Sequence, residues 1–370
     1  MTIRSVMLWS LAALAPVSAA WAEGYSVRLA VSSGRKSIRV SADGLVVKDG
    51  DVGDVLLEGH AGPLPIVSGD EGLRLPGVEV KPRSVLLEAE GHVRVGKRRL
   101  VGRVEVYSRP AGLLVVNRLG LERYLTGMLA AEMSASWPLE ALRAQAVASR
   151  TYAVRRCLDR QEDEYDLSVS VLDQVYKGID EEAERTRKAV ASTAGEVLTY
   201  RGVPAEALFH SCCGGRTRSA EQVFGNAVDY LVAVEDPDCK DCPKHEWRVE
   251  LTPRELASRL AAGSRGIGNL RTVEKVRVGK GRHVIALRGG KGSLLRLSGH
   301  RLRMLIGPDV LPSGEFDIEQ GKGCVVFKGH GSGHGVGMCQ WGARGKALRG
   351  ENYRSILAHY FPGTRLSAMY

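Results

Sequence analysis

The stretch LERYLTGMLAAEMSASWPLEALRAQAVASRTYAV, residues 121–154, decides the fold because the spacing of apolar residues changes there. Before it, from Tyr25 onward, short runs of Val, Leu and Ile alternate with Gly and Asp turn signals, a period-two pattern typical of strands. Within it, apolar residues recur at three- and four-residue steps, which predicts helices. Pro138 suits a first helical turn, with Ser136 as its expected cap.

The remainder of the chain mixes helices and strands. A second helix is expected over 180–195, ending at Gly195, and a hairpin over 196–215 with Gly202 in its turn. A short helix capped by Thr252 and three further strands precede a closing helix at about Tyr353–Tyr360. We therefore predict an α+β fold with a β-rich N-terminal region over 23–95 and a mixed α+β domain over 96–370.

Residues 1–22 have the features of a secretory signal. Arg4 precedes an apolar run from Val6 to Ala20, and the small-residue pattern Ala20-Trp21-Ala22 predicts cleavage after Ala22. An uncleaved anchor is the alternative, although the run falls short of the roughly 20 residues that a spanning helix needs. We expect a protein that is exported to the periplasm or cell envelope and touches the membrane only through this segment.

The chain is basic, with a formal net charge of +10. Such a charge favours an anionic polymer as partner. The export signal argues against nucleic acid, and the basic residues spread from Arg28 to Arg365 without a clustered stripe or an aromatic platform. We therefore expect an anionic polymer of the cell envelope and no nucleic acid.

Glu132 is the first candidate for catalysis. Its neighbours are small or apolar: Leu129, Ala130, Ala131, Met133 and Trp137. Partial desolvation is expected to raise the pKa of this carboxyl group toward the range in which it can donate a proton near neutral pH. The alternative is a surface glutamate just ahead of a helix, attracted by the helix N-terminus.

A glycine-rich segment, GHGSGHGVGMCQWGARGKAL at 329–348, is the second candidate. Six glycines lie from Gly329 to Gly342, so the backbone can approach a ligand closely while side chains offer hydrogen-bond donors and a flat apolar face. The pattern suits a polar ring such as a sugar, and it lacks the Lys and Ser/Thr of a phosphate loop. A metal pair made of His330 and His334 lacks a third ligand at matching spacing, and a tight structural loop is the alternative.

The cysteines form the third candidate. Cys239 and Cys242 are spaced Cys-x-x-Cys with His245 nearby, and Cys213 lies about 26 residues upstream, which matches structural zinc spacing. Exported chains also form disulfides, so Cys213 bonded to Cys239 or Cys242 competes with zinc. Cys324 and Cys339 form a candidate separate pair.

Three blocks of the sequence closely resemble the SpoIID/LytB family of bacterial envelope proteins. They are the stretch 121–154, the stretches LFHSCCGGRTRSAEQVFG (208–225) and YLVAVEDP (230–237), and GHGVGMCQWGARGKALRGENYRSILAHYFPGT (333–364). The resemblance covers about residue 95 to the end. The chain departs from the family pattern at Cys339, where Ser is common, and in its paired Cys212 and Cys213.

The resemblance implies a sporulation-related lytic transglycosylase that remodels the cell wall by cutting the glycan strands of peptidoglycan, with Glu132 as general acid and then base. The chemistry requires no cofactor, because the C6 hydroxyl of the muramic acid is the nucleophile and one carboxyl group suffices. Matching positions line the glycan groove: Gln145, Arg150, Tyr152, His334, Gln340 and Trp341.

Three further interpretations remain open. Some family members hold zinc with Cys and His ligands, which favours a structural zinc at Cys213, Cys239, Cys242 and His245. The LytB side of the family implies instead a non-catalytic wall-binding enhancer of a separate amidase. A zinc hydrolase would need an open metal position.

Overall fold

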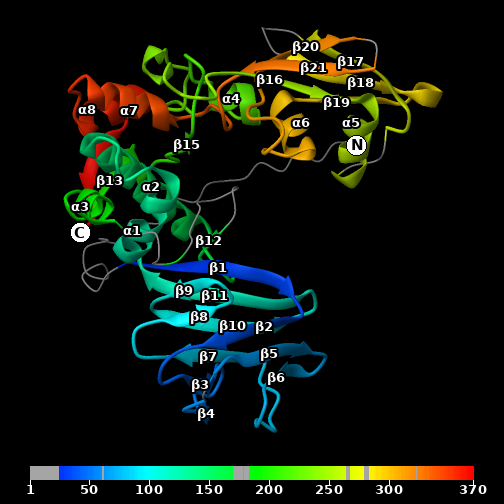
Figure 1. Ribbon diagram of the computed structural model, residues 1–370. Coiled ribbons are helices and arrows are strands. Elements are labelled where there is room, and N and C mark those ends of the chain that lie inside the picture. Colours follow the sequence, from blue (N-terminus) through cyan, green and yellow to red (C-terminus); the bar gives the residue numbers. More distant parts are fainter. Residues whose placement is uncertain are drawn as a thin grey trace, which may run out of the picture.

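The computed structural model describes residues 25–60, 62–169, 178, 183–263, 267–278, 283–321 and 323–370. The expected secretory signal lies outside these residues. The described chain has three parts: an N-terminal β region, a helical centre, and a second β-rich module whose segment 246–330 interrupts the helical centre (Figure 1). The α+β class expected from the sequence is confirmed.

The N-terminal β region consists of two sheets. One has seven strands in the order β12-β1-β11-β10-β7-β3-β4, and the other has five in the order β6-β5-β2-β8-β9. The strands are β1 (Ser26–Arg35), β2 (Ser37–Ser41), β3 (Val46–Asp49), β4 (Val55–Glu58), β5 (Leu64–Gly69), β6 (Gly72–Arg74), β7 (Ser84–Glu88), β8 (Val93–Val95), β9 (Arg98–Leu100), β10 (Arg103–Arg109), β11 (Gly112–Gly120) and β12 (Leu167–Ser168). Our expected boundary at residue 95 falls between β8 and β9, which pair antiparallel, so the β-rich part extends to Gly120.

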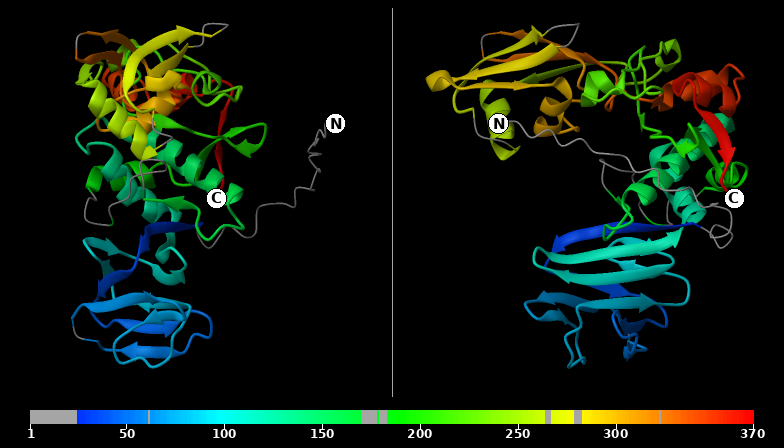
Figure 2. Two further views of the ribbon diagram at one scale, coloured as in Figure 1. Left: turned by 90° about the vertical axis from the view of Figure 1, so that its right-hand side faces the viewer. Right: turned by 180° about the vertical axis from the view of Figure 1, so that it is seen from behind.

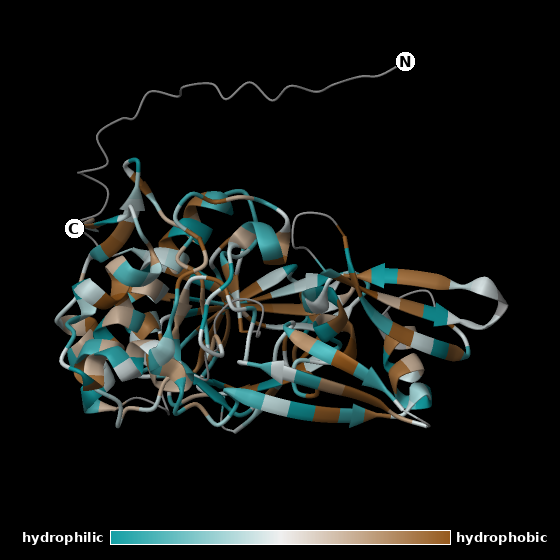
Figure 3. Ribbon diagram, turned by 90° about the horizontal axis from the view of Figure 1, so that it is seen from above, coloured by the Kyte–Doolittle hydropathy of each residue, from teal (hydrophilic) through white to brown (hydrophobic). Residues whose placement is uncertain are grey.

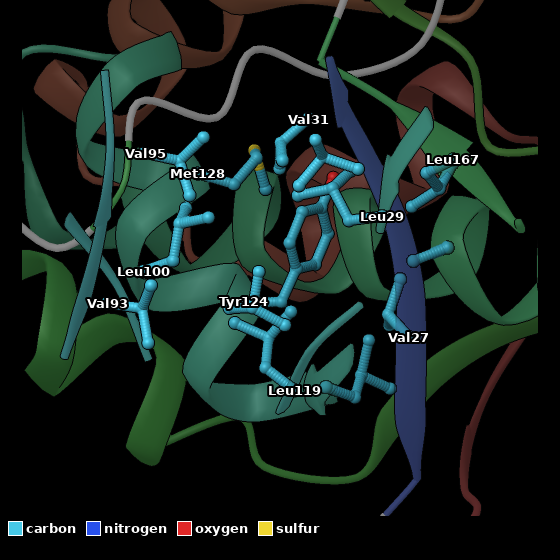
Figure 4. Close-up of a cluster of buried hydrophobic side chains, with 14 of the residues drawn as sticks. Val27, Leu29, Val31, Val93, Val95, Leu100, Leu119, Tyr124, Met128 and Leu167 are labelled. Carbon is cyan, nitrogen blue, oxygen red and sulfur yellow. The ribbon is translucent and has the colours of Figure 1, made fainter. Parts of the chain in front are cut away.

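The core of this region reaches into the first helix. Alternate residues of β1, namely Val27, Leu29 and Val31, point to the same side and are fully or nearly fully buried. Tyr124 and Met128 of helix α1 (Leu121–Glu132) fill the space between them and the second sheet (Figure 4). The position of α1, and hence of its last residue, is therefore set by the β region.

Helix α2 (Leu139–Asp159) is the centre of the helical part. It contacts α1, α3 (Glu184–Ala191), α7 (Gln340–Leu348) and α8 (Tyr353–Tyr360). Small residues at 144, 146 and 148 allow these helices to approach closely, and the segment 144–154 is buried on every side. Ser136 does not cap α2, because its hydroxyl is hydrogen-bonded to that of Ser134 at 2.9 Å and Pro138 precedes the helix without a side-chain cap.

The predicted hairpin and closing helix are confirmed. β13 (Glu196–Tyr200) and β14 (Val203–Pro204) pair antiparallel through a turn in which Gly202 has a φ of 81°. The final strand β23 (Arg365–Ala368) adds to β13. Helix α3 ends at Ala191, before the expected Gly195, which follows with a φ of 71°. Two short segments, β15 (Phe209–His210) and β22 (Met338–Cys339), pair in parallel and bring the middle and C-terminal blocks together.

The segment 246–330, here called the inserted module, has a hydrophobic core of its own. Its strands form two three-stranded sheets, β16-β21-β20 and β17-β18-β19, along which apolar and polar residues alternate (Figure 3). The elements are β16 (Glu246–Leu251), α5 (Pro253–Gly263), β17 (Leu270–Arg277), β18 (His283–Gly289), β19 (Leu294–Leu297), α6 (Gly299–Ile306), β20 (Phe316–Gln320) and β21 (Val325–His330). Thr252 caps α5 as predicted, accepting from the Glu255 amide at 3.1 Å.

The inserted module begins and ends at neighbouring points. Glu246 pairs with His330 across β16 and β21, and the Gly331 amide donates to the His245 carbonyl at 3.0 Å. The module and the N-terminal β region lie at opposite ends of the molecule, with the helices between them (Figure 2). In the described part of the chain, we find no helix with the length and apolarity that crossing a bilayer requires.

Candidate functional site

Glu132 is the last residue of α1. The chain leaves the helix at Met133, which is extended, and the Glu132 side chain is half-buried. The alternative interpretation was a surface glutamate just ahead of a helix, whose N-terminus would attract the carboxylate. At the C-terminal end of α1 the partial charge of the helix is negative, so the helix to which Glu132 belongs does not stabilise its ionised form. A purely electrostatic role at a helix N-terminus therefore does not describe this residue.

A line of polar side chains connects Glu132 to the centre of the helical part. Nε2 of Gln340, the first residue of α7, lies 3.5 Å from Oε2 of Glu132 and 3.4 Å from Oε1 of Gln145 on α2. The Gln145 amide in turn donates to the Ser149 hydroxyl at 2.9 Å. Gln145 and Ser149 are fully buried and Gln340 is nearly so. Because buried amides must keep their hydrogen bonds, this line fixes the orientation of Gln340 beside Glu132.

A tryptophan pair includes Trp341, the residue that follows Gln340 on α7. The rings of Trp137 and Trp341 meet edge to face with centroids 5.1 Å apart, and both are half-buried. The Arg344 guanidinium lies 5.2 Å from the centroid of Trp341 and 5.9 Å from that of Trp137. Sequence reasoning missed Arg344, although its position three residues after Trp341 on a helix places the two on one face.

The loop between α1 and α2 is held in place from α3. The Arg185 guanidinium donates to the carbonyl oxygens of Ala135 at 2.8 Å and Trp137 at 2.9 Å. Trp137 is thereby fixed next to Trp341. The resulting surface offers partly exposed aromatic rings, which suit a polymer of sugars. The Arg344 guanidinium beside the rings is also 3.6 Å from a carboxylate oxygen of Asp241.

His334 belongs to a different cluster. Its ring lies 5.5 Å from that of His210 and 5.7 Å from that of Phe224, and its Nδ1 accepts a hydrogen bond from the Val336 amide at 3.1 Å. Burial, with added repulsion from His210 and His300, lowers the pKa of His334 to about 3, so the ring is neutral at neutral pH. Gln340, rather than His334, is the residue of the glycine-rich segment that is hydrogen-bonded to Glu132.

The lowered pKa of His334 predicts that the folded protein loses stability in acid. The unfolded chain binds a proton on His334 near the ordinary pKa of 6.5, whereas the folded protein, with His210, His300 and Arg303 around the ring, binds it only near pH 3. Stability is therefore complete above about pH 6.5 and falls as the pH drops toward 3, by about 2 to 4 kcal/mol. Urea unfolding at a series of pH values measures this loss. His334→Gln should flatten the dependence, and equal slopes in both proteins would contradict the assignment.

Two expected groove residues lie elsewhere. Arg150 is fully buried and pairs with Glu122 at 2.6 Å, while also donating to the carbonyl oxygens of Val190 and Glu196. Tyr152 is buried in the core that α2 shares with the N-terminal β region, with the Arg156 guanidinium 4.7 Å from its ring centroid. Of the six expected groove residues, Gln340 is hydrogen-bonded to Glu132, Gln145 is hydrogen-bonded to Gln340, and Trp341 follows Gln340 on α7.

The cysteines assemble in a cluster of different composition from the one expected. Among the residues the structure describes, the ligand atoms that lie within 4.8 Å of one another belong to Cys213, Asp236, Cys239 and Cys339. Cys242 is hydrogen-bonded to Cys212 beside this group, and neither Cys242 nor His245 is part of it. All seven cysteines are free thiols, and Cys339 lies in this cluster rather than paired with Cys324.

Gly342 allows this cluster and α7 to pack together. A Cβ atom there would overlap the Asp236 carboxylate and the Tyr360 hydroxyl. We expect Gly342→Ala to destabilise the protein by about 1 to 3 kcal/mol through overpacking, despite the higher helix propensity of Ala. Thermal unfolding measures the effect. Gly120→Ala, where a Cβ meets nothing within 4 Å, is the matched control and should cost less than about 1 kcal/mol. Equal losses in the two variants would refute this explanation.

Comparison with known proteins identifies relatives of this chain. The profile of the family described as SpoIID, stage II sporulation protein, matches residues 110–200, which contain Glu132 and Gln145. An uncharacterized protein of Brachyspira hyodysenteriae is 34% identical over 304 residues, which cover 80% of each chain. Stage II sporulation protein D of Bacillus subtilis is 33% identical over 270 residues, 68% of this chain and 76% of its own.

A further relative carries a different name. The amidase enhancer of Bacillus subtilis is 29% identical over 293 residues, which cover 66% of this chain and 40% of the enhancer. The matches to the Brachyspira protein and to the Bacillus subtilis sporulation protein span most of both partners. The chain therefore belongs to the stage II sporulation protein D (SpoIID) family, as its three sequence blocks predict.

Proposed function

We propose that this protein is an exported lytic transglycosylase that cleaves the bond between N-acetylmuramic acid and N-acetylglucosamine in peptidoglycan. The observation that carries the proposal is the Glu132 carboxylate, held beside the Gln340 amide at 3.5 Å and bordered by the tryptophan pair. Relatives named for sporulation and for an amidase enhancer support a place in the cell envelope.

One carboxyl group can perform the whole reaction. Protonated Glu132 gives its proton to the glycosidic oxygen as the bond from C1 of the muramic acid to that oxygen breaks. The C6 hydroxyl of the same sugar then forms a bond to C1 and returns its proton to the Glu132 carboxylate. The product is a 1,6-anhydro sugar and no water is consumed, so the second carboxyl group of ordinary glycosidases is unnecessary.

The neighbouring residues have supporting roles in this scheme. The Gln340 amide donates to Oε2 of Glu132, which orients the carboxyl group. Trp137 and Trp341 offer apolar ring surfaces to sugar faces, and Arg344 adds a positive charge beside them. The basic net charge favours approach to an anionic wall polymer.

A second candidate function is a wall-binding enhancer of an amidase. It is favoured by the tryptophan pair and Arg344, which would bind glycan equally well without catalysis, and by the relative that carries the name amidase enhancer. The two functions differ in what the purified protein releases on its own.

The test is mass analysis of soluble products after the purified protein is incubated with intact and with peptide-free sacculi in water enriched in heavy oxygen. A transglycosylase releases anhydro-muramyl ends that contain no heavy oxygen. Reducing ends that contain it would establish hydrolysis and overturn the proposal. Absence of any product, together with stimulation of an added amidase, would establish the enhancer.

A further inference from the structure

The five-stranded sheet of the N-terminal β region, whose strands are labelled in Figure 1, has one buried face and one outer face. Successive side chains of a strand point to opposite faces, so the buried residues identify the inner face. Val93, Val95 and Leu100 are among them and point into the core (Figure 4). The outer face carries four arginines: Arg39, Arg74, Arg94 and Arg99. None of the five strands contains an Asp or a Glu.

The arginines of this outer face lie on neighbouring strands. Arg94 of β8 is directly opposite Arg99 of β9 in the register. The partner of Arg94 on β2 is Ser41, so Arg39, two residues earlier, is its diagonal neighbour. Such positions are about 5 Å apart when opposite and about 7 to 8 Å apart on the diagonal, and like charges directly opposite each other destabilise a sheet. The stability of the sheet therefore does not explain this row of cations.

The seven-stranded sheet of the same region treats its cations differently. Three of them have carboxylate partners: Lys48 with Glu88 at 2.6 Å, Arg103 with Glu105 at 2.7 Å, and Arg109 with Glu164. On the five-stranded sheet, Arg39, Arg74 and Arg94 are exposed, and their guanidinium groups have no ion pair or hydrogen bond with any residue that the structure describes. The cations that are available to a ligand are thus gathered on one face.

The sequence does not reveal this face. Arg39, Arg74 and Arg94 are separated by 35 and 20 residues, so the basic residues look evenly spread along the chain. The strand order β6-β5-β2-β8-β9 brings them to one surface. The absence of a basic stripe in the sequence is therefore not an absence in the fold.

The chemistry of the outer face favours carboxylates on a linear polymer. A free guanidinium group binds a carboxylate or a phosphate through two parallel hydrogen bonds. The five strands contain no aromatic residue, so they lack the stacking platform of proteins that bind single-stranded nucleic acid. Pro65 and Val67, the larger apolar residues that point outward, are half-buried, so the face also lacks the exposed apolar side chains that enter a bilayer.

We propose that this outer face is a second wall-binding site, which holds peptide-bearing strands of peptidoglycan through the carboxylate groups of their stem peptides. The identity of the polymer rests on the proposed function, in which Glu132 acts on the same wall. The core of the β region includes residues of α1, the helix that ends at Glu132. A strand held on this face would therefore stay close to Glu132 and raise the effective concentration of substrate there.

The test is co-sedimentation of the full-length protein with sacculi from which hydrofluoric acid has removed phosphodiester polymers. The variant Arg39→Gln/Arg94→Gln should bind about tenfold more weakly at low salt, because two exposed ion pairs are lost. The matched control is Lys48→Gln/Arg109→Gln, which removes the same charge from paired positions of the seven-stranded sheet. It should bind within about twofold of the unaltered protein. Unfolding curves check that both variants are folded.

A second arm changes the polymer instead of the protein. Sacculi whose carboxyl groups are converted to neutral amides with carbodiimide and ethanolamine should bind the unaltered protein about tenfold more weakly. Retention on unmodified sacculi should fall as salt is added, because the contacts are between exposed charges. Retention does not depend on product release, so Glu132→Gln should bind as the unaltered protein does. Failure of the catalytic proposal and failure of this inference are therefore seen separately.

Three results would overturn the inference. One is equal retention of the two double variants. Another is undiminished retention of the unaltered protein on amidated sacculi, which needs no variant to fold. The third is binding to phosphatidylglycerol vesicles without binding to the stripped sacculi, which would assign the face to a bilayer surface.

Discussion

Glu132→Gln should abolish the release of anhydro-muramyl products from sacculi. General acid and base catalysis by a positioned side chain is worth about 10²- to 10⁴-fold in rate, and here one group would supply both steps, so we expect a loss of at least about 10³-fold. The amide cannot donate a proton of comparable acidity or take one back. It has the same size and still presents an oxygen to Gln340, so the fold should be unchanged.

The matched control is Glu90→Gln, which makes the same chemical change at an exposed position in the N-terminal β region. It should release product at the unaltered rate. Unfolding curves of both variants check that the protein is intact. Full product release by a folded Glu132→Gln protein would remove Glu132 from the mechanism, and with it the single-carboxylate scheme.

Arg150→Met should lower the free energy of unfolding more than Gly342→Ala or Arg155→Met does. The Arg150 side chain has no exposed surface and makes two hydrogen bonds to the Glu122 carboxylate, at 2.6 and 2.8 Å. It also donates hydrogen bonds to the carbonyl oxygens of Val190 and Glu196. Removing Arg150 leaves the buried carbonyl oxygens without this donor and takes the cation from the Glu122 carboxylate, which is 33% exposed and keeps the Tyr370 hydroxyl as a donor. We expect a loss of about 3 kcal/mol in the free energy of unfolding.

Helix α2 contains its own control. Arg155 forms an ion pair with Asp159 at 3.0 Å, one turn apart, and the side chains are 35% and 38% exposed. Water can replace that partner, so Arg155→Met should cost less than about 1 kcal/mol. Urea unfolding followed by tryptophan fluorescence compares the two variants. Losses of equal size would show that burial of the Arg150 pair does not matter.

Local patterns predicted much of the fold. Alternating residues identified the N-terminal strands, Thr252 marked the start of α5, and the closing helix lies at Tyr353–Tyr360 as expected. Each of these depends on neighbours within a few residues. The strand pattern in the sequence continues to Gly120, but the pairing of β8 with β9, which joins the two sides of residue 95, is not specified by local sequence. The separate core of the inserted module was missed because local patterns do not show which strands and helices pack together.

Some of the candidate site residues lie together. Gln340 is hydrogen-bonded to Glu132 and to Gln145, and Trp341 follows Gln340 on α7. Arg150 lies on the same helix as Gln145, but five residues further along it faces α1 and pairs with Glu122 instead. A helix buried on every side gives no apolar stripe from which the orientation of each residue could be inferred. Asp236 and Cys339 lie far apart in the sequence, so their convergence could be seen only in three dimensions.

The neighbouring ends of the inserted module have a consequence for how this protein can change. Because Glu246 and His330 are paired strand partners, a short turn could join residue 245 to residue 331 without moving Cys239 or Cys339. The module could equally be exchanged for another folded unit with close termini. The inserted module can therefore be lengthened, replaced or deleted in evolution or by design. Such changes should leave Glu132 and the helices around it in place.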